Sequence, residues 1–211
     1  KEPNSYTGLG FCFFTSKNNN NIMLNLVLFG PPGAGKGTQS AKLIDKYALH
    51  HISTGDMFRG HIKDQTPLGK EVSQIIADGN LVPDSITISM LEEELKNNPD
   101  AKGFIFDGFP RTVAQAEALD KFLEANNTSI TGVIALDVDE AELTQRIAKR
   151  QEISGRADDA ADKLQKRIEE YFGKTIHVLP YYEEQGKLSK VNGIGDIEEI
   201  FANLSNVIDN Y

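Results

Sequence analysis

The chain is poor in several features that would point to particular classes of protein. Its 211 residues include one cysteine, Cys12, and no tryptophan, and no apolar run approaches the length of a membrane span. A single cysteine excludes an internal disulfide and a zinc site built from cysteines. The net charge of −9 at pH 7 argues against a broad surface for nucleic acid or for an anionic membrane. We therefore expect a reducing, cytoplasmic setting, with neither nucleic acid nor membrane as a partner.

Arginine is also scarce, with six residues against sixteen lysines. The guanidinium fork suits bidentate contact with phosphate, so a few arginines fit a cleft that holds phosphorylated ligands. The alternative is that several form surface ion pairs, as Glu142 and Arg146 can at a spacing of one helical turn. The six arginines are Arg59, Arg111, Arg146, Arg150, Arg156 and Arg167.

Nine consecutive residues, 30–38 with the sequence GPPGAGKGT, are typical of a phosphate-binding loop. They follow an apolar run at 24–29 that predicts a buried parallel strand, and they precede a predicted helix at 39–47. The side chains of this helix that we expect to be buried are Ala41, Leu43, Ile44 and Tyr47. Glycines let the backbone curve around an anion so that its N–H groups face phosphate oxygens, and the helix N-terminus adds positive potential.

Within the loop, Lys36 is expected to reach the terminal phosphates of a nucleotide, and the Thr38 hydroxyl to bind Mg²⁺. Gly37 between them departs from the plain pattern. The alternative is a glycine-rich turn that only joins a strand to a helix. Asp107 closes the apolar stretch 103–107 and is a candidate for binding hydrated Mg²⁺, the alternative being a cap on the next turn.

The order of the expected elements predicts an α/β fold, a doubly wound five-stranded parallel sheet with right-handed crossovers. Strands are predicted at 24–29, 50–53, 103–107, 128–137 and 187–191. Ligands of such sheets bind beyond the carboxyl ends of the strands. We expect Gly30, Thr54 and Asp107 to converge there because each of them closes or follows a predicted strand.

Helix-start signals divide the segments between the strands. Ser53 or Thr54, Asp84 and Asp139 are the expected caps of three helices. The predicted helices are 39–47, one that begins at Thr54, 67–78, 84–96, one after Asp139 that carries Arg146 and Arg150, one from about 160 that carries Arg167, and 196–210. Because Arg146 and Arg150 are four residues apart, both guanidinium groups can reach the same phosphate chain.

Residues 1–22 differ in composition from the rest of the chain. They contain an unbroken run of asparagines at 18–21 and resemble neither a secretory signal nor a mitochondrial presequence. We expect them to form a flexible extension without a catalytic role, with Met23 as a candidate natural start. The core is then predicted to span 23–211.

Six motifs together resemble the adenylate kinase family, and in wording most of all its bacterial members with a short lid. They are GPPGAGKGT, STGDMFR, GNLVPD, GFIFDGFPRT with Gln115, the helix with Arg146 and Arg150, and SGRADD with Arg167. The resemblance covers nearly everything from residue 23 to 211. It implies a fold of the P-loop nucleoside monophosphate kinase type, with an AMP-binding flap at about 53–82 and a lid at about 149–160. It also implies a monomer that transfers a phosphoryl group reversibly from ATP to AMP, giving two ADP, with Mg²⁺ and without zinc.

The resemblance assigns roles at the matching positions. ATP is implied to contact Gly33, Ala34, Gly35, Lys36, Gly37, Thr38, Arg150 and Gly195. AMP is implied to contact Thr54, Arg59, Asn80, Leu81, Val82, Gly108, Phe109, Pro110, Arg111, Gln115, Arg156 and Arg167. The implied catalytic residues are Lys36, Arg111, Arg146, Arg150, Arg156 and Arg167, and Asp107 is implied to orient the metal.

Other functions stay open at this point. UMP/CMP kinases share the short lid and the SGR turn, but their acceptor pocket usually differs at the positions of Thr54 and Gln115. A GTPase switch needs an Asn-Lys-x-Asp segment, which the sequence lacks. A nucleotide sensor without catalysis is the third alternative. Gly195 stands where some relatives place a lysine near the donor base, so the donor-base selectivity is open.

Overall fold

Five parallel strands form a single sheet with the order β2-β3-β1-β4-β5. The structure is a computed structural model that describes residues 23–154 and 161–211, apart from the side chains of residues 150–154 and 161–162. The strands are β1 (Leu24–Phe29), β2 (His50–Ser53), β3 (Gly103–Asp107), β4 (Gly132–Asp137) and β5 (Leu188–Asn192). The predicted α/β class and the parallel sheet are therefore confirmed.

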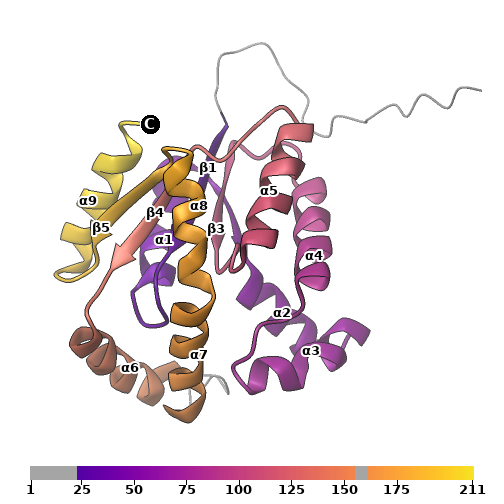
Figure 1. Ribbon diagram of the computed structural model, residues 1–211, viewed down its shortest axis with the longest axis vertical. Coiled ribbons are helices and arrows are strands. Elements are labelled where there is room, and N and C mark those ends of the chain that lie inside the picture. Colours follow the sequence, from indigo (N-terminus) through magenta and orange to yellow (C-terminus); the bar gives the residue numbers. More distant parts are fainter. Residues whose placement is uncertain (1–22, 155–160) are drawn as a thin grey trace, which may run out of the picture.

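Helices cover both faces of the sheet and extend beyond its carboxyl edge (Figure 1). Those packed on the faces are α1 (Lys36–Tyr47), α4 (Asp84–Asn97), α5 (Val113–Ala125), α8 (Val178–Glu184) and α9 (Ile197–Ile208). Those at the carboxyl edge are α2 (Thr54–Lys63), α3 (Pro67–Ala77), α6 (Glu140–Ser154) and α7 (Ala161–Gly173), and a short 3₁₀ helix, η2 (Thr175–His177), links α7 to α8. In the described part of the chain, no helix has the length and apolar character needed to cross a membrane.

Alternation of side chains along β1 separates two hydrophobic cores. Leu26 and Leu28 pack with side chains of α1 and α9, whereas Val27 and Phe29 pack with those of α4, α5 and α8. Successive residues of a strand point to opposite faces, so an apolar run without polar interruption predicts a strand covered on both sides. Each fully buried side chain of this kind contributes about 1.5–3 kcal/mol relative to an exposed one. Both faces of the sheet thereby hold the carboxyl ends of its strands in fixed positions.

A third, smaller core lies under α2 and α3. Phe58, Val72, Val82 and Met90 are buried there, away from the sheet. Figure 1 shows α2 and α3 on one side of the carboxyl edge and α6 on the other. The segment expected as a flap therefore has a small core of its own, and its boundaries at about 53–82 stay a prediction. The extension at 1–22 and residues 155–160 of the predicted lid lie outside the described residues.

The first helix differs from its prediction. It begins at Lys36 rather than at 39, directly after Gly35, whose φ of 94° ends the loop in the left-handed region. Ala41 was expected in the core and is exposed, because the side of α1 that faces inward carries Gln39, Ser40 and Leu43. Polar residues next to the loop therefore occupy positions that hydrophobic patterning alone assigns to apolar ones.

Three other predictions need correction. The fourth strand begins at Gly132 rather than at 128, because the buried side chain of Asn25 donates to the Thr128 hydroxyl (2.9 Å) and the Ser129 carbonyl (2.9 Å) and holds that segment outside the regular strand. The fifth strand is shifted by one residue, to Leu188–Asn192. α8 was not expected, and its Pro180 is compatible with the first turn of a helix, where the missing N–H has no partner to lose.

Asp84 does not cap α4. The residue at the N-cap is Pro83, and no side chain caps this helix. The Asp84 carboxylate instead accepts hydrogen bonds from Thr112, in the β3–α5 connection, and from Gln115, in α5. The caps expected from Ser53 and Asp139 are confirmed, since Ser53 Oγ accepts from the Asp56 N–H and Asp139 Oδ1 from the Glu142 N–H.

Candidate active site

Three adjoining cavities open at the carboxyl edge of the sheet. The main cavity has a volume of about 850 Å³ and is lined by the loop at 32–38 and by residues of α2, α6 and α7. The second and third cavities measure about 60 Å³ each. Gly108, Arg111 and Arg167 line all three, so these residues lie where the cavities meet. Ligands in the main and second cavities would therefore meet beside three arginines, because Arg59 also lines these two cavities.

Three glycines give the phosphate loop its shape. Gly30, Gly33 and Gly35 have φ values of 154°, 88° and 94°, which residues with a side chain rarely adopt. At Gly33 the conformation is also tight, since a Cβ there would lie 3.2 Å from Cγ1 of Ile147. The Lys36 ammonium donates hydrogen bonds to the carbonyls of Gly30 (2.7 Å) and Pro31 (3.2 Å). Lys36 thus lies across the loop, at the N-terminus of α1 and the wall of the main cavity.

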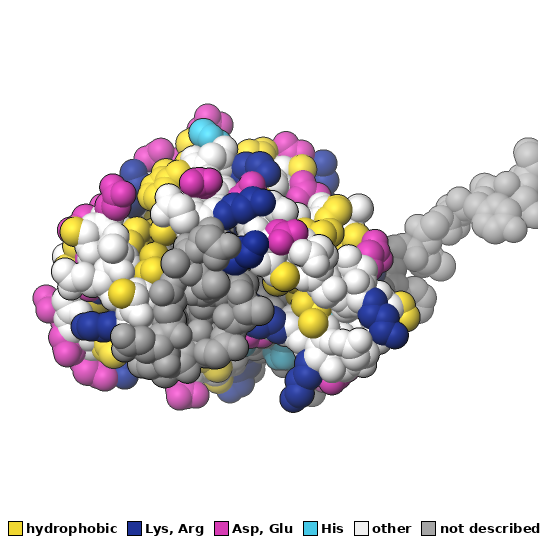
Figure 2. Space-filling view, turned by 90° about the horizontal axis from the view of Figure 1, so that it is seen from below, with side chains coloured by type: hydrophobic (Ala, Val, Ile, Leu, Met, Phe, Trp, Pro, Cys, Tyr) yellow, Lys and Arg dark blue, Asp and Glu magenta, His cyan; other side chains and the backbone are white. Residues whose placement is uncertain are grey.

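Positive charge prevails in the main cavity although the whole chain is acidic. Its lining contains six basic side chains against three acidic ones, in a chain of net charge −9. The basic ones are Lys36, Arg59, Arg111, Arg146, Lys149 and Arg167. Seen from this edge, several Lys and Arg side chains lie in the middle of the face (Figure 2). A local excess of positive charge in a cleft attracts polyanionic ligands, as the scarce arginines predicted.

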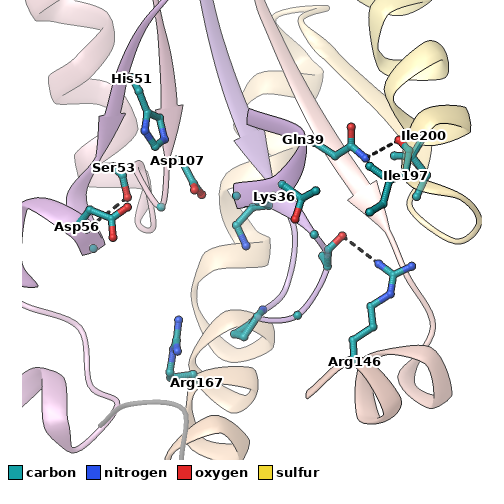
Figure 3. Close-up of a pocket in the computed structure, with 18 of the residues that line it drawn as sticks. Lys36, Gln39, His51, Ser53, Asp56, Asp107, Arg146, Arg167, Ile197 and Ile200 are labelled. Carbon is teal, nitrogen blue, oxygen red and sulfur yellow. Dashed lines mark hydrogen bonds between the residues drawn. The ribbon is translucent and has the colours of Figure 1, made fainter. Parts of the chain in front are cut away.

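Arg146 connects the phosphate loop to the turn after β5. Its guanidinium donates to the Ala34 carbonyl (3.2 Å) and to the Gly193 carbonyl (2.8 Å), and its Nε donates to Glu142 Oε1 (2.6 Å). Figure 3 shows the bond to the loop, with Arg167 of α7 and Lys36 on the other side of the loop. The ion pair with Glu142, raised as an alternative to a phosphate role, is therefore present, and the same side chain lines the main cavity.

Gly108 lies between the main cavity and the second cavity and lines both. Its carbonyl accepts a hydrogen bond from the Thr54 hydroxyl (2.9 Å) and another from Arg111 Nε (2.8 Å). Its φ is 77°, and a Cβ would lie 3.0 Å from Arg111 Nη2. The Phe109–Pro110 peptide bond is cis. This short segment thereby sets the direction of the Arg111 guanidinium and ties it to the start of α2.

The second cavity combines an apolar wall with a few buried polar groups. Phe58, Val82 and Thr87 are buried beside Leu81, while Asn80 is exposed at the rim. Pockets for planar organic ligands have this composition, in which polar groups set the orientation. Arg59 lies at the boundary with the main cavity, and its Nη2 donates to Asp56 Oδ1 (2.6 Å).

Gln115 is the most buried polar side chain of the second cavity, at 2 % exposure. Its Oε1 accepts from the Arg111 N–H (2.8 Å), and its Nε2 donates to Asp84 Oδ1 (2.7 Å). Asp84 Oδ2 in turn accepts from the Thr112 hydroxyl (2.8 Å). These contacts of Asp84 were not predicted from the sequence, although the residue closes the GNLVPD motif. A carboxylate at a helix start predicts a cap, and only the tertiary fold shows its partners.

Asp107 lies at the carboxyl end of β3, where it is half-buried on the wall of the main cavity. Figure 3 shows its carboxylate near Ser53 of the adjacent strand and on the opposite side of the loop from Arg146. Among the residues that the structure describes, no group of three or more His, Cys, Asp or Glu side chains is placed to hold a metal ion. The Asp107 carboxylate and the Thr38 hydroxyl line the same cavity. This small set of oxygen ligands fits Mg²⁺, which binds few protein groups and keeps waters and substrate phosphates as its other ligands.

Nearly all the site residues expected from the sequence line these cavities. Arg156 lies outside the described residues, as does the side chain of Arg150. Every other expected site residue lines at least one of the three cavities. Gln39 was not expected there; its side chain lines the main cavity and donates to the Ile197 carbonyl (3.0 Å), which links α1 to α9. The contacts bring the expected residues together, and their individual roles stay predictions.

A glycine-rich loop before the first helix of a parallel sheet, facing a second pocket across shared arginines, defines a nucleotide-dependent phosphotransferase. A model of the family described as adenylate kinase matches residues 28–187. The proteins named adenylate kinase from Flavobacterium psychrophilum and Flavobacterium johnsoniae are 51 % and 50 % identical to the chain, over 89 % of it and 100 % of their own length. The one from Maricaulis maris is 46 % identical over 88 % of the chain and 99 % of its own length.

The chain therefore belongs to the adenylate kinase family. It is a phosphotransferase with nucleoside monophosphate kinase activity, and its fold is the P-loop nucleoside monophosphate kinase fold expected from the motifs. Nucleotides are its substrates.

Proposed function

We propose that the chain transfers the γ-phosphoryl group of ATP directly to the phosphate of AMP, reversibly and in line, giving two ADP. The observation that carries this proposal is the shared boundary of the main and second cavities at Gly108, Arg111 and Arg167. Two ligands that occupy these cavities present their phosphates to the same arginines. No protein nucleophile is needed, because an oxygen of AMP attacks the γ-phosphorus and catalysis consists of positioning and charge stabilisation.

The donor is assigned to the main cavity. Backbone N–H groups of Gly33–Thr38 bind its phosphates, and Lys36 exchanges its bonds to the Gly30 and Pro31 carbonyls for contacts with the terminal phosphates. Gly195, with a φ of 130° on the wall of the same cavity, is assigned to the donor base through its backbone. Arg150 is assigned to the donor phosphates from the family resemblance alone.

The acceptor is assigned to the second cavity. Gln115 reads the adenine edge, and the apolar wall with Leu81 and Val82 packs against the base. The remaining assigned contacts are Thr54, Arg59, Asn80, Gly108, Phe109, Pro110, Arg111, Arg156 and Arg167. A buried amide discriminates strongly between bases, because a mismatched base leaves its polar groups unpaired. The Gln115 amide therefore favours AMP over UMP as the acceptor, because uracil presents an acceptor where adenine presents an amino group.

The arginines stabilise the charge that develops on the transferring phosphoryl group. Arg111 and Arg167 line both the donor and the acceptor cavities, which supports their assignment to this step together with Arg146, Arg150 and Arg156. Asp107 and Thr38 are the residues that would hold Mg²⁺, Asp107 through coordinated water. When bound, Mg²⁺ neutralises phosphate charge and helps to orient the donor.

Water must be kept from the reacting phosphate, because it would otherwise accept the phosphoryl group and waste ATP. The flap at about 53–82 and the lid at about 149–160 are proposed to close over the substrates for this reason. We also infer a cytoplasmic monomer that uses neither zinc nor a nucleic-acid or membrane partner.

A coupled assay of ADP formation with Mg-ATP tests the proposal, with AMP, CMP, UMP and GMP offered in turn. We expect strong activity with AMP alone. Activity mainly with CMP or UMP would assign the chain to UMP/CMP kinases instead. Tight ATP binding without transfer to any acceptor would favour the nucleotide sensor and overturn the proposal.

A further inference from the structure

Asp84 lies behind the second cavity rather than on its wall. It does not line any of the three cavities of the site, whereas its partner Gln115 lines the second one. The two residues are 31 positions apart and come from α4 and α5. Thr112 closes the group, since its hydroxyl donates to Asp84 Oδ2 and accepts from the Gln115 N–H (3.2 Å). The three residues therefore form a ring of hydrogen bonds.

The chemistry of these partners fixes which way the Gln115 amide faces. A carboxylate oxygen only accepts hydrogen bonds, so Asp84 Oδ1 requires the NH₂ end of the amide. A backbone N–H only donates, so Arg111 requires the carbonyl end. Turning the amide by 180° would set a carbonyl against a carboxylate and an NH₂ against an N–H. Both contacts are repulsive and partly buried, so both contribute to a single orientation.

The fixed amide has one N–H and one carbonyl lone pair left for a ligand. On either of its edges adenine presents the 6-amino group, a donor, beside a ring nitrogen that accepts. Gln115 in the observed orientation matches this pair, with Oε1 toward the amino group and Nε2 toward the ring nitrogen. A purine with a 6-oxo group places an acceptor opposite Oε1 and is therefore rejected.

We propose that Asp84 is a positioning residue that makes the acceptor site select 6-amino over 6-oxo purine nucleotides. This inference rests on the proposed function, because it takes the second cavity as the site of the acceptor base. Asp84 touches no substrate and acts through Gln115. Thr112 supports it by holding the second carboxylate oxygen.

Asp84→Asn tests the inference, with AMP and inosine monophosphate (IMP) compared as acceptors. IMP differs from AMP in the 6-oxo group and the proton on N1. Asn at 84 both donates and accepts, so it satisfies Gln115 in either orientation. The Arg111 N–H remains as the other constraint, so we expect the ratio of kcat/KM for AMP to that for IMP to fall by about tenfold rather than vanish.

Three measurements separate positioning from a structural lesion. The KM for ATP and the melting temperature are expected to stay near wild type. Asp84→Glu, which keeps a group that only accepts, is expected to retain a ratio close to wild type even if the KM for AMP rises. Asp139→Asn removes another carboxylate at a helix start, where Asn caps equally well, and is expected to change neither KM nor the ratio.

An unchanged AMP/IMP ratio in Asp84→Asn would overturn the inference, and so would an equal fall of the ratio in Asp84→Glu. If Asp84→Asn does not fold, Asp84→Ser, which also donates and accepts, carries the same expectation. A wild-type protein that does not phosphorylate AMP would instead overturn the proposed function, so the two failures are distinguishable.

Discussion

The phosphate loop is a run of nine consecutive residues, whereas the second cavity, which we assign to the acceptor, is assembled from four separate stretches, within 54–59, 76–87, 108–115 and at 167. In the loop, Lys36 hydrogen-bonds to carbonyls five and six positions away. At the second cavity, the Thr54 hydroxyl bonds to the Gly108 carbonyl, 54 positions away, and Gln115 bonds to Asp84, which lies behind the cavity and 31 positions away. The shape of the loop therefore depends on local backbone contacts, and the shape of the second cavity depends on the tertiary fold.

This difference predicts separable defects. A substitution in the loop is expected to lower turnover while acceptor binding and folding stay intact. A substitution in the second cavity is expected to raise the KM for AMP, or to lower the stability of the fold, while the KM for ATP changes little. The following predictions test that separation, in order of decreasing effect.

Lys36→Ala removes the only lysine of the loop. Without its charge, the developing charge on the phosphoryl oxygens loses a stabilising partner, and we expect turnover to fall by about 10³-fold or more. Steady-state assays of ADP formation measure kcat, and calorimetry measures AMP affinity, which we expect to be unchanged. Lys70→Ala, at an exposed position of α3, is the control for loss of a positive charge. A parallel loss of AMP binding would contradict the separation.

Gln115→Glu places a second carboxylate against Asp84 and removes the N–H that reads the base. Like charges at hydrogen-bond distance repel, and the lost donor is buried, so we expect the KM for AMP to rise by about 100-fold. The KM for ATP is expected to stay within about twofold of wild type, because Gln115 lines the second cavity and not the main one. Equal increases of both KM values would show that the two sides are not separable.

Gly108→Ala changes a residue that lines both the main and the second cavity. Alanine would adopt a φ of 77° under strain, with its Cβ 3.0 Å from Arg111 Nη2 and 3.3 Å from Thr54 Oγ1. We expect the free energy of unfolding to fall by about 1–2 kcal/mol, as urea denaturation would measure, together with a higher KM for AMP. Gly173→Ala is the matched control, since a Cβ there meets nothing within 4 Å. A loss of stability of similar size in the control would contradict the strain argument.

The smallest effect on stability is expected from Asp209, which lies outside both cavities and bonds to Lys46 and Tyr47 of α1. Hydrogen bonds from the Tyr47 hydroxyl and then from Lys46 hold the pKa of Asp209 below its ordinary value of 3.8. A lowered pKa stabilises the fold above the ordinary value, and that contribution is lost as the pH falls through the lowered one. The Asp209 side chain is 54 % exposed, so the contribution is small.

We therefore expect Asp209→Asn to lower the melting temperature at pH 7 by no more than about 2 °C. The difference from wild type is expected to shrink as the pH falls below 3.8, and both KM values are expected to stay unchanged. Melting curves between pH 7 and pH 3 measure this. A difference in melting temperature that grows as the pH falls would contradict a lowered pKa of Asp209.

The same comparison explains how far the sequence alone could go. The loop, the strand before it and the residues that line the cleft were predictable, because contiguous glycines, an apolar run and strand-end positions carry local signals. The contact between Gln115 and Asp84 was not predictable. A carboxylate at the first residue of a helix gives the same local signal whether it caps that helix or binds another element. The predictions for Ala41 and for the start of β4 were wrong for a related reason. Polar side chains, among them Gln39 and Asn25, are buried at these places, and hydrophobic patterning does not predict buried polar residues.

The central claim is that two separately built subsites hand a phosphoryl group directly from one nucleotide to the other. The most direct test is to mix the protein with Mg-ATP labelled in the γ-phosphate and with unlabelled AMP, and to follow the label at early times. The account predicts that the label appears in the β-phosphate of ADP. Label released as inorganic phosphate, or retained covalently on the protein, would contradict it.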